Sequence, residues 1–157
     1  MRLSFETVFL RVLLATLLGA AIGLEREYRR KPAGLRTNML IALGSAVFVV
    51  VSLEIGSGSG SPDRIAAQIV TGIGFLGAGA ILRTGANIHG LTTAATIWVN
   101  AAIGMAAGAG QYAIALASAL IALVVLIVLP FVERPIDELE QRESSLTGHR
   151  VSDHRKD

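Results

Sequence analysis

The charged side chains of this chain collect in a few short stretches and leave long tracts almost free of charge. A soluble helical protein of 157 residues would distribute its 14 basic and 12 acidic residues along the exposed face of every helix. Here 52% of the residues are hydrophobic. The uncharged tracts have close to the length of about 20 residues that a membrane-crossing helix needs. The pattern predicts an all-α fold, a polytopic bundle of transmembrane helices.

Five tracts have the composition of membrane spans. They lie at residues 3–24, 38–53, 65–82, 91–108 and 112–131. A segment rich in glycine and serine before Pro62 separates the second tract from the third and predicts a loop. We expect a transmembrane domain at 1–132, followed by a charged cytoplasmic tail at 133–157 that is too polar for a core and partly disordered.

The distribution of Lys and Arg predicts the orientation of the spans, because cytoplasmic loops carry an excess of these residues. The basic residues that fall on one side are Arg26, Arg29, Arg30, Lys31, Arg36, Arg83, Arg134, Arg142, Arg150, Arg155 and Lys156. The opposite side carries Arg2 and Arg64. We therefore expect the N-terminus outside and the C-terminus in the cytoplasm. A signal peptide cleaved near Ala21 is a rival interpretation, but cleavage there would leave the basic loop outside.

Composition argues against several classes of function. A net charge of +2 is too small to indicate a nucleic-acid partner. The chain has no cysteine, which excludes disulfides, thiolate metal ligands and cysteine nucleophiles. His89 lies in a short connection, and His149 and His154 lie in the tail, so no general base is expected in a cleft. We predict that the protein is not an enzyme and needs no cofactor.

Two glycine patterns resemble nucleotide-binding motifs without their context. A G-x-G-x-x-G pattern that starts at Gly72 lies inside an apolar tract, with no acidic residue about 20 positions later. The segment Gly85–Thr92 approximates a phosphate-binding loop but has Leu91 in place of the lysine. We interpret the first pattern as helix packing and the second as a turn at Gly90, followed by Thr92 as a helix cap.

Small residues within the tracts predict close helix crossings, because a glycine lets two backbones approach. The packing candidates are Gly19, Gly23, Gly72, Gly74, Gly77, Gly79, Gly104 and Gly108. Four of them lie in the third tract, so we expect that helix to be central and its glycine-rich face to support a homo-oligomer.

Polar residues inside the tracts predict interhelical hydrogen bonds more readily than an ion pathway. These residues are Gln68, Thr71, Thr96 and Asn100. No carboxylate occupies the middle of a tract, which argues against a dedicated magnesium pathway and leaves any metal site unknown. Arg11 interrupts the first tract, and we expect its side chain to extend outward to the membrane surface.

A second polar group gathers on the predicted cytoplasmic face. Its candidate functional residues are Glu25, Arg29, Arg36, Asn38, Arg83, Asn87 and Thr92. Glu25 and Arg29 are four positions apart and can pair on one helix face. Two interpretations stay open: a functional site, or a solvated helix end whose basic residues meet anionic lipid.

Three runs of sequence resemble the MgtC/SapB family. They are GLEREYRRKPAGLRTNMLIALGSAVF from Gly23, RIAAQIVTGIGFLGAGAIL from Arg64 and HGLTTAATIWVNAAIG from His89. The resemblance covers the chain from about Leu13 to Tyr112. It is more specific than any single motif, because three long runs match in order.

The resemblance implies a multi-pass protein of the bacterial inner (plasma) membrane with about five spans. It also implies a role in growth under magnesium limitation and, in pathogens, in survival inside macrophages. The implied action is regulatory, through lipid-embedded partners such as the membrane sector of ATP synthase. The alternative is a small oligomeric ion channel or magnesium transporter. Longer relatives carry a soluble C-terminal domain, which leaves in doubt any function that needs it.

Single cysteines introduced into this cysteine-free chain test the orientation. A cysteine at Ser59 should react with an impermeant maleimide in intact cells. Cysteines at Arg30, Asn87 and Ser145 should react only after lysis, because the basic loops are expected to face the cytoplasm. Labelling of the position 30 variant in intact cells would reverse the predicted orientation.

Overall fold

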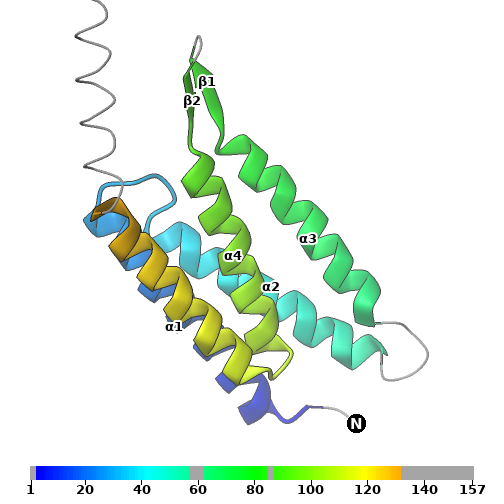
Figure 1. Cartoon of the computed structure of the whole chain (residues 1–157). Helices are drawn as coiled ribbons and strands as arrows, with labels where there is room; N and C mark the ends of the chain where they lie inside the picture. The colour runs from blue at the N-terminus through cyan, green and yellow to red at the C-terminus, as the bar shows by residue number, and fades with distance from the viewer. Residues whose placement is uncertain (1–2, 57–61, 85–86, 132–157) are drawn as a thin grey trace, which may run out of the picture. The chain divides into compact units, whose positions relative to one another are not determined.

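The computed structural model describes residues 3–56, 62–84 and 87–131 of the chain (Figure 1). The chain divides into two compact units, Met1–Leu123 and Val124–Asp157. The elements of the first unit are α1 (Phe5–Tyr28), α2 (Leu35–Gly56), α3 (Pro62–Gly79), β1 (Leu82–Thr84), β2 (Asn87–His89) and α4 (Leu91–Gly108). A further helix, Tyr112–Phe131, begins in the first unit, and its residues 124–131 are the described part of the second. The predicted tail at 133–157 lies outside the described residues.

The helices confirm the predicted all-α membrane bundle. α1, α2, α4 and the Tyr112–Phe131 helix are each long and apolar enough to cross a membrane, with mean hydropathies of 2.1, 2.0, 1.2 and 2.9. The apolar part of α3, Arg64–Gly79, is shorter. The connection after α3 contains an antiparallel hairpin in which Leu82 pairs with His89. The side of the membrane on which each terminus lies stays a prediction.

α1 continues beyond the predicted end of the first span and is joined closely to α2. It runs through three consecutive charged residues to Tyr28. Arg30 and Ala33 then adopt positive φ angles of 54° and 55° as the chain reverses. Glu27 Oε2 accepts a hydrogen bond of 3.1 Å from the backbone N–H of Leu35. A carboxylate of α1 therefore stabilises the N-terminus of α2, where backbone donors lack helical partners.

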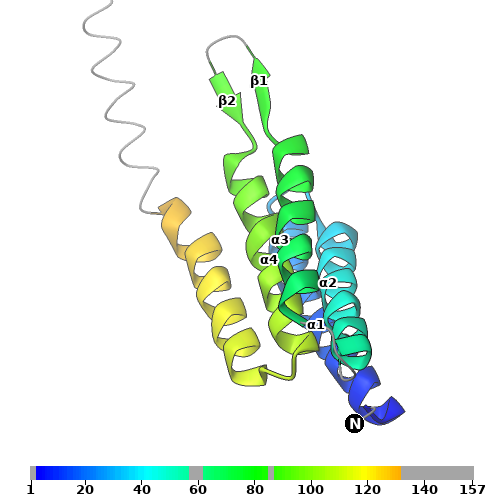
Figure 2. The same ribbon diagram turned by 90° about the vertical axis from the view of Figure 1, so that its right-hand side faces the viewer.

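α2 and α4 form the centre of the first unit (Figure 1, Figure 2). Each of them packs against the other and against both α1 and α3. α3 packs on α2 and α4 and lies at the edge of this group. The prediction that the third helix is central is therefore wrong. The glycines of α3 leave space along the helix, but no neighbouring helix has to occupy that space.

The crossing of α4 on α2 depends on two glycines. A Cβ atom at Gly104 would lie 2.4 Å from the carbonyl oxygen of Ala42. A Cβ atom at Gly108 would lie 2.6 Å from the carbonyl oxygen of Ala46. Both distances are shorter than van der Waals contact and involve backbone atoms, which cannot move without separating the helices. These two positions therefore need glycine for the helices to meet.

α1 approaches α2 in the same way, whereas α3 does not. Cβ atoms at Gly19 and Gly23 would lie 2.7 Å from backbone atoms of α2. Gly77 has ordinary contact with Ala94 of α4, at 3.6 Å or more. No described atom outside its own helix backbone lies within 4 Å of a Cβ built on the other glycines of α3. These are Gly72, Gly74 and Gly79, and the packing prediction fails for them within this chain.

Arg11 binds the end of α4. Its Nη1 donates a hydrogen bond of 2.9 Å to the carbonyl oxygen of Gly108, the last residue of α4. The final carbonyls of a helix have no helical partner and carry partial negative charge, so a guanidinium is well matched to them. The guanidinium therefore has a partner at the end of α4, and its position relative to the membrane surface stays a prediction.

Gly104→Ala should reduce the stability of the purified protein in detergent by about 1 to 3 kcal/mol, the usual cost of overpacking a tight site. The added methyl group would collide with the backbone of Ala42. Gly74→Ala is the matched control, because open space surrounds that position. Thermal unfolding of both variants measures the difference. Equal midpoints would contradict the role given to the α2–α4 crossing.

Candidate functional site

Most of the predicted functional residues lie at one end of the first unit. There α1 ends, α2 and α4 begin, and the hairpin follows α3 (Figure 1). We call this region the basic end, after the four cationic residues Arg29, Arg30, Lys31 and Arg36. Its polar side chains divide into a buried group that joins the helices and an exposed group on the surface.

Arg26 belongs to the buried group, and sequence analysis did not single it out as a site residue. It is 4% exposed, and its Nη2 donates a hydrogen bond of 3.0 Å to Thr93 Oγ1 of α4. The spacing of Arg26 from two glycines of α1 could have identified it. Arg26 follows Gly23 by three positions and Gly19 by seven, which places all three on one helix face. A charge on the face that meets other helices needs a partner there.

Glu25 and Arg29 form the ion pair that their spacing allows. Arg29 Nε lies 2.7 Å from Glu25 Oε1, and the Glu25 side chain is 8% exposed. Pairing within one turn neutralises a carboxylate that would otherwise be buried beside the helix interface. These two site candidates are brought together. Both lie at the end of α1, where Glu25 is nearly buried and Arg29 is partly exposed.

Asn38 and Asn100 form a buried amide contact between α2 and α4. Both side chains are 0% exposed. Asn100 Nδ2 donates to the Asn38 carbonyl oxygen at 2.7 Å and to Asn38 Oδ1 at 3.1 Å. Asn38 Nδ2 in turn donates to the Gly34 carbonyl oxygen at 3.0 Å. Asn38 therefore lies inside the bundle, which corrects its predicted place on the cytoplasmic face.

The threonines make local bonds. Thr96 Oγ1 donates to the Thr92 carbonyl oxygen at 2.7 Å, and Thr71 Oγ1 donates to the Ala67 carbonyl oxygen at 3.1 Å. Such bonds to the preceding turn satisfy a hydroxyl in an apolar environment. Thr92 is exposed and is not the cap of α4.

Gly90 is the cap of α4, with a φ angle of 89°. A Cβ atom at this position would lie 2.0 Å from the Ala80 carbonyl oxygen. Glycine is therefore required both by the left-handed backbone and by the close approach of the chain before the hairpin. The turn predicted at Gly90 is present. The N-cap of α4 is Gly90 and not the predicted Thr92.

The exposed group lies around the start of α2 and on the hairpin. Arg30, Lys31 and Arg36 are exposed, and within the described chain none of them forms an ion pair. Asn87 is exposed on β2. Arg83 lies in β1 opposite Ile88, and its side chain is outside the described part. This arrangement produces a positive surface that can attract anionic groups.

No group of three metal-binding side chains was found among residues 3–56, 62–84 and 87–131. Gln68, the remaining intramembrane candidate, is exposed on α3 and away from the Asn38–Asn100 contact. The predicted polar residues thus form no single cluster. Some join the helices, some cover the basic end, and Gln68 and Thr71 are exposed on α3.

Comparisons with known proteins agree on one family. The MgtC family model matches residues 12–135. A protein named "Protein MgtC" from Salmonella typhimurium is 52% identical over 138 residues, which cover 88% of this chain and 59% of the relative. A protein of the same name from Brucella abortus is 48% identical over 134 residues, covering 85% of this chain and 54% of the relative. The chain thus spans little more than half the length of these curated relatives. No solved structure matches significantly.

Asn100→Ala should destabilise the protein by about 1 to 2 kcal/mol, the range of an interhelical hydrogen bond in a membrane. Asn38→Ala should also destabilise it, and the double variant should lose less than the sum, because the two side chains share one contact. Asn87→Ala, on the exposed hairpin, is the control and should change stability by less than about 0.5 kcal/mol. Thermal unfolding in detergent measures all four proteins. Full additivity would show that the amides act independently.

Proposed function

Because the chain belongs to the MgtC family, we propose that it is a non-catalytic bacterial inner-membrane protein that supports magnesium or membrane-energy homeostasis. It acts by binding other membrane proteins, with the membrane sector of ATP synthase as one candidate partner, and it functions as a homo-oligomer during adaptation to low magnesium. The same proposal includes a contribution to virulence where proteins of this type occur in pathogens.

This proposal rests on where the polar side chains lie. Inside the spans, polar side chains join helices to each other: Asn100 to Asn38, Arg26 to Thr93 and Arg11 to the end of α4. A transport pathway needs polar groups that are free to replace the hydration of an ion. Arg30, Lys31 and Arg36 instead lie exposed at the basic end, where they can contact a partner.

The alternative is an ion channel or magnesium transporter formed by an oligomer. The observation in its favour is Gln68, an exposed amide on a helix whose glycines leave space beside it. Backbone carbonyls and a ring of amides from several copies would supply oxygen ligands for a cation. This alternative makes a different prediction for flux.

Flux through the purified protein separates the two proposals. Liposomes that contain the full chain and a magnesium-sensitive dye should show no uptake above empty vesicles under an imposed gradient and potential. Saturable uptake that Gln68→Leu abolishes would replace the interaction proposal with the channel. Thr71→Leu, one turn away and equally exposed, is the control for that substitution.

Growth of a deletion strain in magnesium-poor medium tests the same proposal in cells. The wild-type gene should restore growth, and Asn87→Ala should return it to the level of the deletion while the protein stays abundant, because Asn87 is exposed. Thr71→Ala, exposed on α3 away from the basic end, should grow as the wild type does. Full growth with Asn87→Ala would contradict the role given to the basic end.

A further inference from the structure

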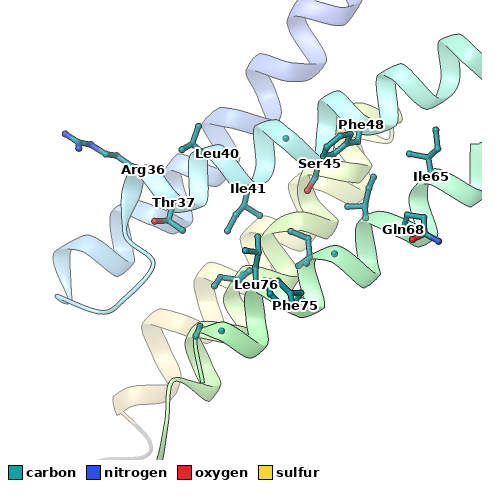
Figure 3. A pocket seen from close by; sticks show the side chains of 17 residues that line it. Arg36, Thr37, Leu40, Ile41, Ser45, Phe48, Ile65, Gln68, Phe75 and Leu76 are labelled. Carbon is teal, nitrogen blue, oxygen red and sulfur yellow. The ribbon is translucent and has the colours of Figure 1, made fainter. Parts of the chain in front are cut away.

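An open apolar groove of 1060 Å³ runs between α2 and α3 (Figure 3). α2 contributes Leu40, Ile41 and Phe48, and α3 contributes Ile69, Phe75 and Leu76. Ile97 of α4 also lines it. In Figure 3 Arg36 and Thr37 lie at one end of the groove, and Phe48 lies toward the other. The groove is thus mostly apolar, although Ser45 and Gln68 also line it, and Arg36 and Thr37 lie at its end nearest the basic end.

Absent side chains keep this groove open. Gly44 on α2 and Gly72 on α3 both line it, and a Cβ atom built at either position meets no described atom within 4 Å. Figure 1 shows α2 and α3 close together near residues 56 and 62 and diverging toward the basic end. The backbones of α2 and α3 are therefore farther apart at the end of the groove beside Arg36.

The length of the groove matches one leaflet of a membrane. The α2 residues that line it extend from Arg36 to Phe48, about 18 Å along a helix with a rise of about 1.5 Å per residue. Half of a hydrocarbon core of about 30 Å is about 15 Å. A fatty-acyl chain that starts at the basic end can therefore lie along the groove.

The charge at the end of the groove beside Arg36 indicates the head group. Arg36 is exposed and forms no ion pair within the described chain, and Thr37 beside it is also exposed. Arg30 and Lys31 add two unpaired cations to the same basic end. A phosphate can accept hydrogen bonds from a guanidinium in two places at once, and a threonine hydroxyl is a further donor.

We propose that this groove binds one anionic diacyl phospholipid, with its phosphate on Arg36 and Thr37 and one acyl chain between α2 and α3. A helix from a second copy fits less well. A helix is a rigid cylinder of about 10 Å diameter. α2 and α3 are not parallel along the groove, and a flexible acyl chain can follow both surfaces where a rigid helix cannot.

The first test uses the full chain, purified in a neutral detergent and stripped of lipid. Phosphatidylglycerol should raise its unfolding temperature more than phosphatidylcholine with the same acyl chains, because a ligand that binds only the folded state stabilises it. Arg36→Gln should reduce the ratio of the affinities for the two lipids about fivefold, the factor that corresponds to about 1 kcal/mol for one basic residue near anionic lipid. This ratio follows from how the unfolding temperature rises with the concentration of each lipid. Lys31→Gln, exposed but outside the groove, should retain most of it. Inorganic phosphate alone should have no comparable effect.

The second test blocks the groove. Gly72→Trp should fill it and lower the amount of lipid retained in native mass spectrometry at least tenfold. Gly74→Trp is the matched control, since Gly74 lies on the same helix with equally open surroundings but does not line the groove. Equal retention by the two variants would overturn the proposal. Loss of a dimer in Gly72→Trp without loss of lipid would also overturn it and assign the groove to a second copy.

A third measurement needs no variant and so does not depend on the folding of a substituted protein. Phosphatidylglycerol with a photoreactive diazirine in its acyl chain should label Ile41, Ile69 and Leu76 in the wild-type protein. Phe9 and Leu13 are exposed apolar residues of α1 and report ordinary contact with bulk lipid. Labelling of α1 as strong as that of the groove would overturn the proposal, as would equal stabilisation by the two lipids. Neither result bears on whether the basic end binds a protein partner.

Discussion

The first unit depends on the close approach of α4 to α2. Gly104 and Gly108 lie against the backbone at Ala42 and Ala46, at distances that admit no side chain. Asn100 lies one turn before Gly104, so the same approach brings its amide within 2.7 Å of the Asn38 carbonyl. A hydrogen bond weakens quickly once its atoms separate, and hydrocarbon offers no water to replace it. A change that separates α4 from α2 would therefore weaken both the packing at the glycines and the hydrogen bond between Asn100 and Asn38.

α4 is held by polar contacts along its whole length. Arg26 of α1 binds Thr93 near its start, Asn38 of α2 meets Asn100 in its middle, and Arg11 of α1 binds Gly108 at its end. These three points span about 22 Å of helix. α3 packs against α4 at Gly77, beside Ala94, and its described polar residues Arg64, Gln68 and Thr71 are exposed. The difference explains why α1, α2 and α4 form a firm group while α3 diverges from α2 and leaves a groove.

The sequence predicted the helical elements because hydropathy records directly what a membrane-spanning segment must bury. The fourth and fifth helices have the predicted bounds, 91–108 and 112–131. Arrangement was harder to predict, since glycine indicates only that space is available. Gly19 and Gly104 use that space for a neighbouring helix, whereas Gly72 leaves it empty. Residue type alone does not distinguish these outcomes.

The candidate site was predictable only in part, for a related reason. Position along the chain placed Glu25, Asn38 and Asn87 at one end of the bundle. It did not show that Asn38 points inward and Asn87 outward. The helical spacing of Arg26 from Gly23 contained the missing information, because it sets the face on which each side chain lies.

The glycines of α3 remain to be explained in physical terms. Each glycine inside a helix costs roughly 0.5 to 1 kcal/mol relative to alanine through chain entropy. At Gly104 this cost is offset by the contact with α2. At Gly72 and Gly79 no described neighbour lies within 4 Å, so packing inside the chain does not offset it. Both residues line the groove, and an added side chain there would narrow it. The property that these two glycines supply is therefore the open volume itself, and an open apolar volume inside a membrane is filled by whatever molecule fits its shape and charge. With Arg36 at one end, the molecule that best matches this groove is an anionic lipid.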